Sequence, residues 1–410
     1  MGTGKQILMI DIKFSKKFNV NTHAFNGEGG KLNVPMMLWL SEVEWDALQQ
    51  LEHAASLPFV HHHVAGMPDM HYGFGVPIGS VIPTKGYIIP NAVGVDIGCG
   101  MCCVKTDLTH IDKPVLKSIM GDIRKAVPVG YKHNKKSEGM PPIISMPDLS
   151  KSVVAKEWDS ASKQLGTLGG GNHFIEIQKG DDGFIYVMIH SGSRNLGKKI
   201  ADHYNNIAKE MNEKWKSIVP KNWDLAFLPF HDDIGQMYYH EMVYACDFAY
   251  WNRKVMMKRI KTCITNHVDA KFSNFINIHH NFADMENHFG ENVLVHRKGA
   301  TRAKEGELGL IPGSQGTASY IVKGKGNANS FHSCSHGAGR LMSRRKAKET
   351  LDLKMEKKIL DDQGIIHSVR NLSDLDEASS AYKDIGTVMD HQEDLVEIVT
   401  ELKPLAVIKG

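Results

Sequence analysis

The fold of this chain is organised around Val93-Gly94-Val95-Asp96-Ile97-Gly98-Cys99-Gly100-Met101, its least generic stretch. An apolar run typical of a strand ends there in a glycine-flanked carboxylate, Asp96, and the Cys99 thiol follows three residues later. Glycine lets a backbone turn sharply and approach another group closely, so one tight turn presents both side chains. A carboxylate and a thiolate offered together indicate a metal site.

Composition limits the classes of protein to which the chain can belong. Of its 410 residues, 42% are hydrophobic and 23% are charged, as in ordinary globular proteins. The formal net charge is only +3, so bulk charge does not indicate a nucleic-acid partner and any basic groove must be local. No apolar run approaches the roughly 18 residues of a membrane helix. Asp11 interrupts the apolar start, so no signal peptide is expected either.

The cysteine content indicates a cellular compartment, and the histidine content indicates metal or proton-transfer chemistry. The six cysteines form no paired framework, which indicates a reducing, intracellular compartment, and we expect a cytoplasmic protein. Histidine is unusually common, with 22 residues, and it is both a frequent metal ligand and the proton carrier near neutral pH. A single histidine is nonetheless more often a hydrogen-bonded surface or core residue than a ligand.

Hydrophobic periodicity predicts a mixed α/β (α+β) protein. The capping box Ser41–Glu44 predicts a helix that ends near Ser56, and a long helix is predicted over residues 235–264. Short strands are predicted near residues 293–297, 308–312 and 319–323. Because the chemical motifs extend from residue 69 to the end of the chain, we expect residues 35–410 to form one compact unit after an N-terminal segment, 1–34.

Four segments share one pattern, in which a strand-like run is followed by a turn that carries histidine, cysteine or aspartate. The candidate ligands are Asp96 with Cys99, His173 after Asn172, His190, and the pair His279-His280. Carboxylate, thiolate and imidazole together suit Mn²⁺, Zn²⁺, Co²⁺ or Fe²⁺ better than Mg²⁺ or Ca²⁺. So many ligands suit two ions that share a bridge, an arrangement typical of reactions at phosphorus. The alternative is a zinc knuckle or redox pair at Cys99-x-x-Cys102, although no second CxxC accompanies it.

A second set of residues indicates phosphate chemistry. Glycine-rich turns that can direct backbone N–H groups at phosphate occur at residues 166–171, 313–316 and 337–339, and none matches a P-loop. We predict that Ser333–Arg340 opens a basic helix, which puts His336 at the helix N-terminus and Arg340 one turn later. Such a histidine can attack a nucleotide phosphate and form a phosphoramidate. The alternative is a histidine that only caps the helix.

Other basic residues are weaker candidates for phosphate contacts. Lys298 and Arg194 each follow a strand-like run next to a glycine or serine. Residues 132–150 are predicted to form an exposed basic loop, which is a candidate contact for a polyanion. Most lysines and arginines are surface charge without a ligand, so these assignments depend on where the fold places them.

Eight segments occur in an order that is far more specific than any one of them. They are Met67-Pro68-Asp69-Met70-His71, GVDIGCGM within Val93–Met101, LGGGNHFIE at Leu168–Glu176, HSGSR at His190–Arg194, His279-His280-Asn281, RKGA at Arg297–Ala300, Pro312–Ser319, and SHGAGR at Ser335–Arg340. Together these segments resemble the RtcB family of RNA ligases. The resemblance covers the chain from about residue 35 to its end.

The resemblance implies a fold and an activity. Family members have a single compact fold in which sheets surround a central cleft with two metal ions. They join RNA ending in a 2′,3′-cyclic phosphate or a 3′-phosphate to RNA with a 5′-hydroxyl, in tRNA splicing or RNA repair. The reaction uses GTP and two Mn²⁺ ions, and it proceeds through a guanylylated histidine, which the resemblance identifies as His336.

The resemblance also implies a role for each motif residue. Cys99 would bridge the two metal ions, with Asp96 and His173 completing one shell and His190 and His280 the other. The positions that match the guanine-nucleotide contacts are Asn172, Glu176, Ser314, Ser319, Tyr382 and Lys409. The positions that match contacts around the metals, phosphates and RNA are Asp69, His71, Arg194, Lys298 and Arg340.

At three positions the sequence differs from the residues that are commonest in the family, and none of these positions is a proposed ligand. Asn195 follows HSGSR where glycine is frequent, Ile278 precedes the histidine pair, and Cys103 adds a thiol. Two other readings stay open at this point: a dinuclear metal phosphoesterase acting on cyclic phosphates, and a non-catalytic RNA-binding protein with a structural metal. We expect a monomer, and the resemblance adds an archease-type protein as a candidate activator.

Overall fold

Two sheets carry the residues singled out above. The computed structural model describes residues 7–9, 32–137, 139 and 152–410. One sheet is antiparallel, in the order β11 (Phe272–His279), β7 (Gly100–Thr106), β9 (Ile185–Ser191), β8 (Phe174–Gly180), β18 (Val396–Lys409), β16 (Ser319–Gly324), β15 (Leu308–Ile311). The other has the order β12 (Asn281–His288), β13 (Glu291–Lys298), β5 (Ile78–Thr84), β4 (Val64–His71), β2 (Met36–Leu38), and only its β2–β4 pair is parallel.

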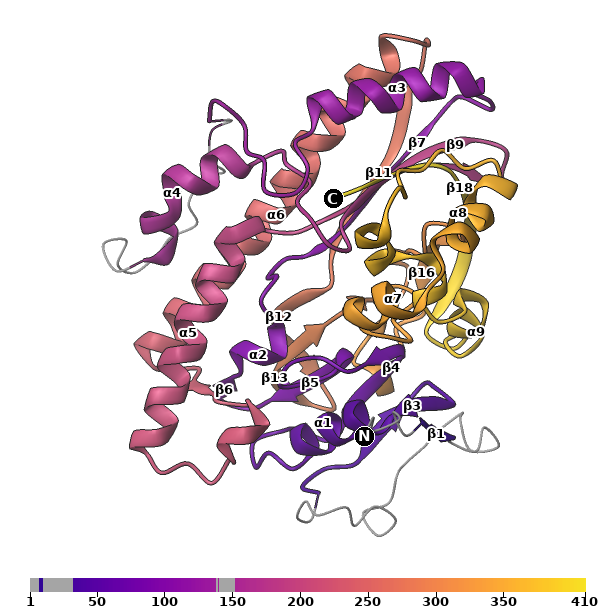
Figure 1. Ribbon diagram of the computed structural model, residues 1–410. Helices are drawn as coiled ribbons and strands as arrows, with labels where there is room; N and C mark the ends of the chain where they lie inside the picture. Colours follow the sequence, from indigo (N-terminus) through magenta and orange to yellow (C-terminus); the bar gives the residue numbers. More distant parts are fainter. Residues whose placement is uncertain (1–6, 10–31, 138, 140–151) are drawn as a thin grey trace.

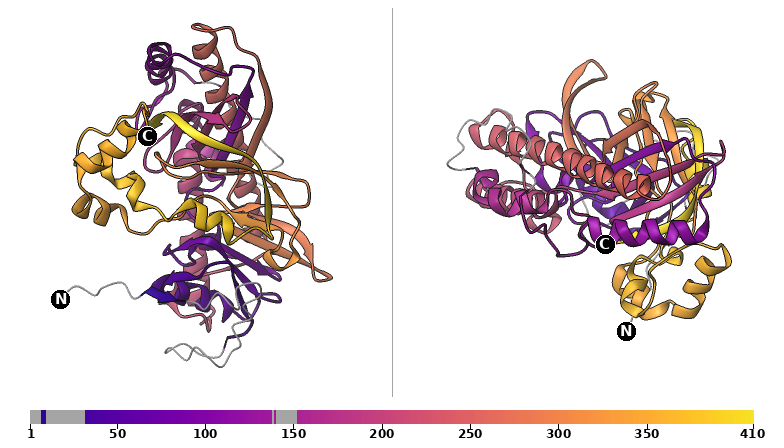
Figure 2. Two further views of the ribbon diagram at one scale, coloured as in Figure 1. Left: turned by 90° about the vertical axis from the view of Figure 1, so that its right-hand side faces the viewer. Right: turned by 90° about the horizontal axis from the view of Figure 1, so that it is seen from above.

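Helices cover the sheets from two sides. The N-terminal half contains α1 (Trp45–Ala55), α2 (Pro90–Val93), α3 (Lys113–Ala126), α4 (Val153–Gln164) and α5 (Arg194–Lys214). They are followed by α6 (Asp233–Thr265), α7 (Arg344–Thr350), α8 (Leu353–Asp362) and α9 (Ile385–Asp390). The long helices α5 and α6 run along one side, and α7, α8 and α9 form a separate group on the opposite side (Figures 1 and 2). Short two-stranded pairs link these parts: β14 (Ala300–Arg302) with β17 (Ser333–Ser335), and β6 (Tyr87–Ile88) with β10 (Leu228–Pro229).

Strand β7 separates two hydrophobic cores. Successive side chains of a strand point to opposite faces of the sheet. Met101 and Cys103 therefore join one core, whereas Cys102 and Val104 join the core that lies beneath α3 and α6. Cys99 precedes the strand at the end that faces the cleft, so the CxxC spacing puts its two thiols in different surroundings.

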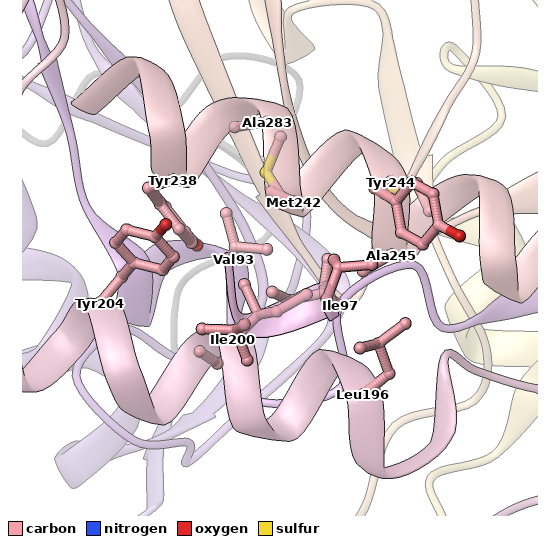
Figure 3. Packing of buried hydrophobic residues seen from close by; sticks show 14 of the residues in the cluster. Val93, Ile97, Leu196, Ile200, Tyr204, Tyr238, Met242, Tyr244, Ala245 and Ala283 are labelled. Carbon is pink, nitrogen blue, oxygen red and sulfur yellow. The ribbon is translucent and has the colours of Figure 1, made fainter. Parts of the chain in front are cut away.

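A third core lies directly behind the Asp96 turn. Val93 and Ile97, which flank the turn, insert between α5 and α6, where Leu196, Ile200 and Met242 are packed (Figure 3). All five side chains are essentially inaccessible to solvent. Burial of each such side chain contributes about 1.5–3 kcal/mol to folding, so the turn that carries Asp96 and Cys99 has a rigid base.

Most of the predicted architecture is confirmed. The chain is a mixed α/β protein, and the helix predicted over residues 235–264 is α6. The three strands predicted near residues 293–297, 308–312 and 319–323 are β13, β15 and β16. In each case strong local periodicity agrees with the packing of the element.

Two predicted helix starts are wrong. The residues of the capping box form a strand, β3 (Glu42–Glu44), which pairs with β1 (Ile7–Met9), and the helix begins only at Trp45. Ser333–Ser335 is also a strand, β17, paired with β14, so His336 does not lie at a helix N-terminus. In both places pairing with a distant strand overrides a local signal for helix capping.

Other sequence predictions are only partly covered by the described residues. Of the basic loop over 132–150, residues 138 and 140–150 lie outside the described part of the chain, and the lysines before them are exposed. In the N-terminal segment the structure describes Ile7–Met9 and residues from 32 onward. Among the helices that are described, none has both the length and the hydropathy needed to cross a membrane.

Candidate active site

The turn from Asp96 to Cys99 is held by its neighbours in space. The Cys99 N–H donates to the Asp96 carbonyl oxygen at 3.1 Å and closes the turn. The Asn281 side-chain amide donates to the same carbonyl at 3.0 Å, and the Asn281 carbonyl accepts from the Gly98 N–H at 2.8 Å. Gly98 has a φ of 72°, and a Cβ there would lie 2.7 Å from the Cα of Cys246 on α6, so only glycine fits.

The five residues predicted as metal ligands meet around the Cys99 sulfur. Its Sγ lies 3.3 Å from Nε2 of His190 and 3.5 Å from Nε2 of His173. An Asp96 carboxylate oxygen is 3.1 Å from Nε2 of His173, and Nε2 of His280 is 3.4 Å from Nε2 of His190. Cys99 and the three histidines are buried, whereas Asp96 is partly open to solvent.

Hydrogen bonds orient two of these imidazoles. Nδ1 of His173 donates to the Leu168 carbonyl at 2.9 Å, and Nδ1 of His190 donates to the Asn172 carbonyl at 3.2 Å. These bonds leave Nε2 of each ring for the cluster: Nε2 of His190 faces the Cys99 thiol, and Nε2 of His173 faces the thiol and the Asp96 carboxylate. Backbone carbonyls that fix the outer nitrogen in this way are typical of metal-ligating histidines.

The protonation states and unpaired atoms of these residues favour a bound cation. Burial, followed by the neighbouring imidazoles, holds the pKa of His190 and of His280 well below the usual value, so both rings are neutral. Burial and the Asp96 carboxylate raise the pKa of the Cys99 thiol well above its usual value. Within the described residues, Nδ1 of the buried His280 has no hydrogen-bond partner. Lone pairs that converge without a proton are stabilised when a metal ion lies between them.

The residues fit two ions better than one. Ligand atoms of Cys99, His190 and His280 form one compact group, and those of Asp96, Cys99 and His173 form another, each with all separations within 4.8 Å. Cys99 belongs to both groups. The donor set of a carboxylate, a thiolate and three imidazoles suits borderline divalent ions.

His336 lies beside this cluster and is oriented by Asp69. One Asp69 carboxylate oxygen is 2.5 Å from Nδ1 of His336 and also accepts the backbone N–H groups of His336 and Gly337, at 3.0 and 3.3 Å. Nε2 of His336 is therefore the free nitrogen. The His336 and His280 rings are 4.8 Å apart between centroids, which brings the free nitrogen next to the metal-ligand cluster.

One cavity of about 440 Å³ joins the cluster to a second group of predicted residues. At the metal end it is lined by Asp96, Cys99, His190, His280 and His336, and at the other end by Glu176, Ser314, Tyr382 and Lys409. Asn172 also lines it and lies between the two groups, because its carbonyl oxygen is 3.2 Å from Nδ1 of His190 and 3.5 Å from Nζ of Lys409. His71, Lys298 and Arg340 also line it. The volume is that of a small-molecule or nucleotide site.

A network of charges closes the far end of the cavity. Glu377 accepts hydrogen bonds from Nε of Arg344 at 2.6 Å and from the Tyr382 hydroxyl, and it forms an ion pair with Arg340 at 3.1 Å. The guanidinium of Arg340 lies over the Tyr382 ring, 5.0 Å from its centroid. Although burial opposes ionisation, the Lys409, Arg344 and Arg340 charges hold the pKa of Glu377 below its usual value.

Glu176 and Lys409 form the floor of the same end. They lie on the paired strands β8 and β18, at neighbouring positions of the register. Burial raises the pKa of Glu176 to about 7, and the nearby Lys409 charge opposes that shift. The Gln178 side-chain amide donates to Glu176 at 2.7 Å and to the Ser319 hydroxyl at 3.1 Å, so Ser319 lies beneath the floor and outside the cavity lining.

The remaining predicted residues occupy three different settings. Nζ of Lys298 is held by the carbonyl oxygens of Phe74 and Asn91 at 2.5 and 3.2 Å, and burial lowers its pKa to about 7. Nδ1 of His71 donates to the Asp69 carbonyl at 2.9 Å. Arg194 is bonded to the Thr167 hydroxyl and the Gly130 carbonyl, behind the metal ligands and outside the cavity lining.

Comparison with known proteins identifies the family. The family model described as tRNA-splicing ligase RtcB matches residues 50–143 and 144–410. The chain belongs to the RtcB family. It is 39% identical to RNA-splicing ligase RtcB of Escherichia coli K12, covering 92% of this chain and 98% of that protein. It is 31% identical to tRNA-splicing ligase RtcB of Methanococcus maripaludis, covering 92% and 95% of the two chains.

Two features of this RtcB-family site were not found from the sequence. The Asp69–His336 contact joins residues far apart in the chain, and the helix predicted at His336 pointed to a different anchor. Glu377 and Arg344, the centre of the charge network, lie in segments without a recognisable pattern. An acidic residue close to basic residues could have indicated the network. Glu377 follows two other acidic residues, Asp374 and Asp376, so the sequence alone does not single it out.

The structure also separates the two thiols of the CxxC alternative. Cys102 is fully buried in the core beneath α3 and α6, and burial raises its pKa to about 12. Its thiol is neither among the grouped ligand atoms nor in the cavity lining. This RtcB-family chain therefore presents Cys99 alone to the cavity.

Proposed function

We propose that the chain is an RNA ligase that joins a 2′,3′-cyclic phosphate or 3′-phosphate end to a 5′-hydroxyl end, with GTP and Mn²⁺. One observation carries the proposal: a free His336 nitrogen, a thiol shared by two groups of metal ligands, and a nucleotide-sized cavity lie together. A phosphoesterase would need the ligands alone, without an oriented nucleophile. Membership of the RtcB family agrees with the ligase.

In the first step, Nε2 of His336 attacks the α-phosphorus of GTP. A nitrogen–phosphorus bond forms, the bond to the β-phosphate oxygen breaks, and pyrophosphate leaves. Asp69 accepts the Nδ1–H of His336, so it keeps the ring in the tautomer with a free Nε2 and stabilises the positive charge that develops on the ring. Two Mn²⁺ ions held by Asp96, Cys99, His173, His190 and His280 would neutralise phosphate charge and polarise the reacting bonds.

In the later steps the guanylyl group activates the RNA end. An oxygen of the RNA 3′-phosphate attacks the phosphorus of guanylylated His336, and the histidine leaves with its electron pair. The resulting diphosphate carries GMP as a leaving group, which the 5′-hydroxyl displaces to form the phosphodiester. A cyclic end must first be hydrolysed to the 3′-phosphate. Lys298 lines the cavity and burial lowers its pKa; it is a candidate donor to these phosphates once its amino group leaves the Phe74 and Asn91 carbonyls.

The far end of the cavity is the proposed guanine site. Guanine presents N–H donors that a carboxylate accepts, and Glu176 is the buried carboxylate on the floor. Asn172, Ser314, Tyr382 and Lys409 surround the same space, and Arg340 lies between it and His336. Ser319 supports the floor through Gln178, and Arg194 acts from behind the metal ligands.

Covalent labelling tests the proposal. The chain is incubated with GTP labelled at the α-phosphate and with Mn²⁺, then denatured and examined for retained label. Wild type retains label, whereas His336→Ala retains none and His367→Ala, a change at an ion pair with Asp361 outside the cavity lining, retains as much as wild type. Absence of label in wild type, together with hydrolysis of cyclic phosphate ends, would identify a phosphoesterase.

Further parts of the proposal concern surroundings and partners. The described cysteines are all free and buried, which agrees with a reducing cytoplasm. RNA with the matching ends is the proposed substrate, a monomer is the proposed state, and an archease-type protein is the proposed activator. We place the start of the catalytic unit at residue 35; the pairing of Ile7–Met9 with Glu42–Glu44 attaches part of the preceding segment to it.

A further inference from the structure

A second group of metal-type ligands lies away from the cavity and plays no part in the proposed reaction. Ligand atoms of Glu286, His288 and His332 lie within 4.8 Å of one another. Glu286 and His288 are near the far end of β12, whose first residue, Asn281, lines the cavity. At about 3.4 Å per residue the group is about 20 Å from the cavity along the strand.

The group is built from two separate parts of the chain. Glu286 and His288 are two residues apart on β12, so their side chains leave the same face of the sheet. His332 comes from the segment that precedes β17, with its backbone fixed to Asn327 and Ala303 at 3.0 and 2.7 Å. The His288 and His332 rings are 4.7 Å apart between centroids.

Hydrogen bonds already prepare two of the three ligands. Nε2 of His288 is 2.9 Å from one Glu286 carboxylate oxygen, so a single proton lies between the two atoms. Arg297 fixes the orientation of Glu286 through both Nη atoms: Nη1 donates to the other carboxylate oxygen at 2.6 Å, and Nη2 donates at 3.2 Å to the oxygen that faces His288. A metal ion that replaces the proton shared with His288 would gain the imidazole nitrogen and this oxygen as ligands, while Nη1 of Arg297 keeps its bond to the other oxygen, as outer hydrogen bonds do in metal sites.

His332 supplies the observation that an ion-pair network alone does not explain. Its ring makes no hydrogen bond to the part of the chain that the structure describes, although it faces His288 and Glu286. His332 and the preceding Phe331 both have positive φ, 49° and 52°, so the chain holds this ring in place through an unfavourable backbone conformation.

We propose that Glu286, His288 and His332 form a separate site for a zinc-class divalent ion, which ties the β12–β13 hairpin to the segment that leads into β17. Two imidazoles and one carboxylate are a common ligand set of Zn²⁺, and solvent beside the half-buried His332 completes the shell. The required closure is small, since atoms bound to one Zn²⁺ lie about 3.3 Å apart. His336 follows His332 by four residues, so the ion stabilises the strand that presents the proposed nucleophile.

Metal analysis in a variant without the cavity ligands tests the site. Cys99→Ala with His190→Ala removes the two groups of cavity ligands; the chain is dialysed against low micromolar Zn²⁺, desalted, and its zinc measured by mass spectrometry. We expect about one zinc ion per chain, and a melting temperature that rises by about 5 °C with zinc. Adding His288→Gln and His332→Ala should remove both the zinc and the shift.

A matched control separates this site from ordinary histidine–carboxylate pairs. His110 and His267 each pair with an aspartate at 3.1 and 2.8 Å but belong to no three-ligand group among the described residues. His110→Gln with His267→Gln should keep the zinc. The proposal is overturned if the chain lacking cavity ligands holds no zinc, or if the zinc persists without His288 and His332. Should the combined variant unfold, His332→Ala alone in the wild-type chain must lower the zinc content by about one ion.

Discussion

The two ends of the cavity differ in how far their polar and charged groups are paired. At the metal end, the Nε2 atoms of His173 and His190 face the Cys99 thiol, and Nε2 of His173 also faces the Asp96 carboxylate. At the other end, the proposed nucleotide end, Glu377 is already paired with Arg344, Arg340 and the Tyr382 hydroxyl. The first set of charges is incomplete without a cation, whereas the second is complete and must exchange partners when a ligand enters.

This difference shows which end depends on rigidity. The metal ligands come from the ends of adjacent strands, β7, β8 and β9, and from the β11–β12 turn, so the sheet fixes their separations. The nucleotide end is assembled from loops and short helices around residues 313–316 and 337–344 and from β18. Substitutions at the metal end should therefore abolish chemistry, and those at the nucleotide end should weaken binding.

The largest effect is expected for Cys99→Ala. Loss of the shared ligand leaves both groups with two ligands each, so metal-dependent guanylylation should fall below detection. Cys102→Ala is the matched control, because it removes a thiol of the same CxxC that lies in the core; it should cost about 1 kcal/mol of stability and leave labelling nearly intact. Equal loss in both variants would revive the CxxC interpretation.

The next largest effect is expected for Asp69→Asn. An asparagine amide lacks the negative charge with which Asp69 accepts the Nδ1–H of His336. The ring can then adopt the other tautomer, in which Nε2 carries the proton and has no lone pair for attack. Guanylylation in a single turnover should slow by about 1,000-fold, while zinc or manganese content stays that of wild type. A decrease below tenfold would show that Asp69 does not orient the nucleophile.

A smaller effect is expected at the nucleotide end. Lys409→Met, or deletion of Lys409 and Gly410, removes a buried charge that lies near Glu377 and Glu176. The KM for GTP should rise by about 10- to 100-fold with a lesser change in kcat, because the loss is of binding. Circular dichroism should report a retained fold. A collapse of kcat with unchanged KM would move Lys409 from the nucleotide site to the chemistry.

The smallest effect is a pH dependence at Glu176. Burial raises its pKa to about 7, so the free protein carries a neutral carboxylic acid below that pH and a carboxylate above it. If the carboxylate accepts the guanine N–H donors, affinity for GMP should weaken as pH falls below about 7, by up to tenfold per unit. Titration calorimetry should give this slope for wild type, and Glu176→Gln should bind weakly with no slope between about pH 6 and pH 8.

The residues of the metal end were predicted from the sequence more fully than those of the proposed nucleotide end, and the reason is physical. Local periodicity and glycine mark strand ends, so Cys99 and His173, just before β7 and β8, and His190, near the end of β9, stand out residue by residue. The run before Asp96, predicted to be a strand, is instead the short helix α2. The Asp69–His336 contact and the Glu377 network form only when distant segments meet, and no local pattern encodes them. The helix predicted at Ser333–Arg340 failed similarly, because pairing with β14 decides that segment.

Steric space, as well as chemistry, restricts which substitutions this site tolerates. A Cβ on Gly192 would lie 2.2 Å from a carboxylate oxygen of Asp96, so alanine there would evict the carboxylate while leaving every ligand in the chain. Gly98 is closed to side chains by α6 in the same way. A survey of tolerated substitutions would therefore mark these glycines as invariant as the ligands themselves. Each of these glycines leaves space that a neighbouring group occupies, so an enzyme engineer should leave both untouched.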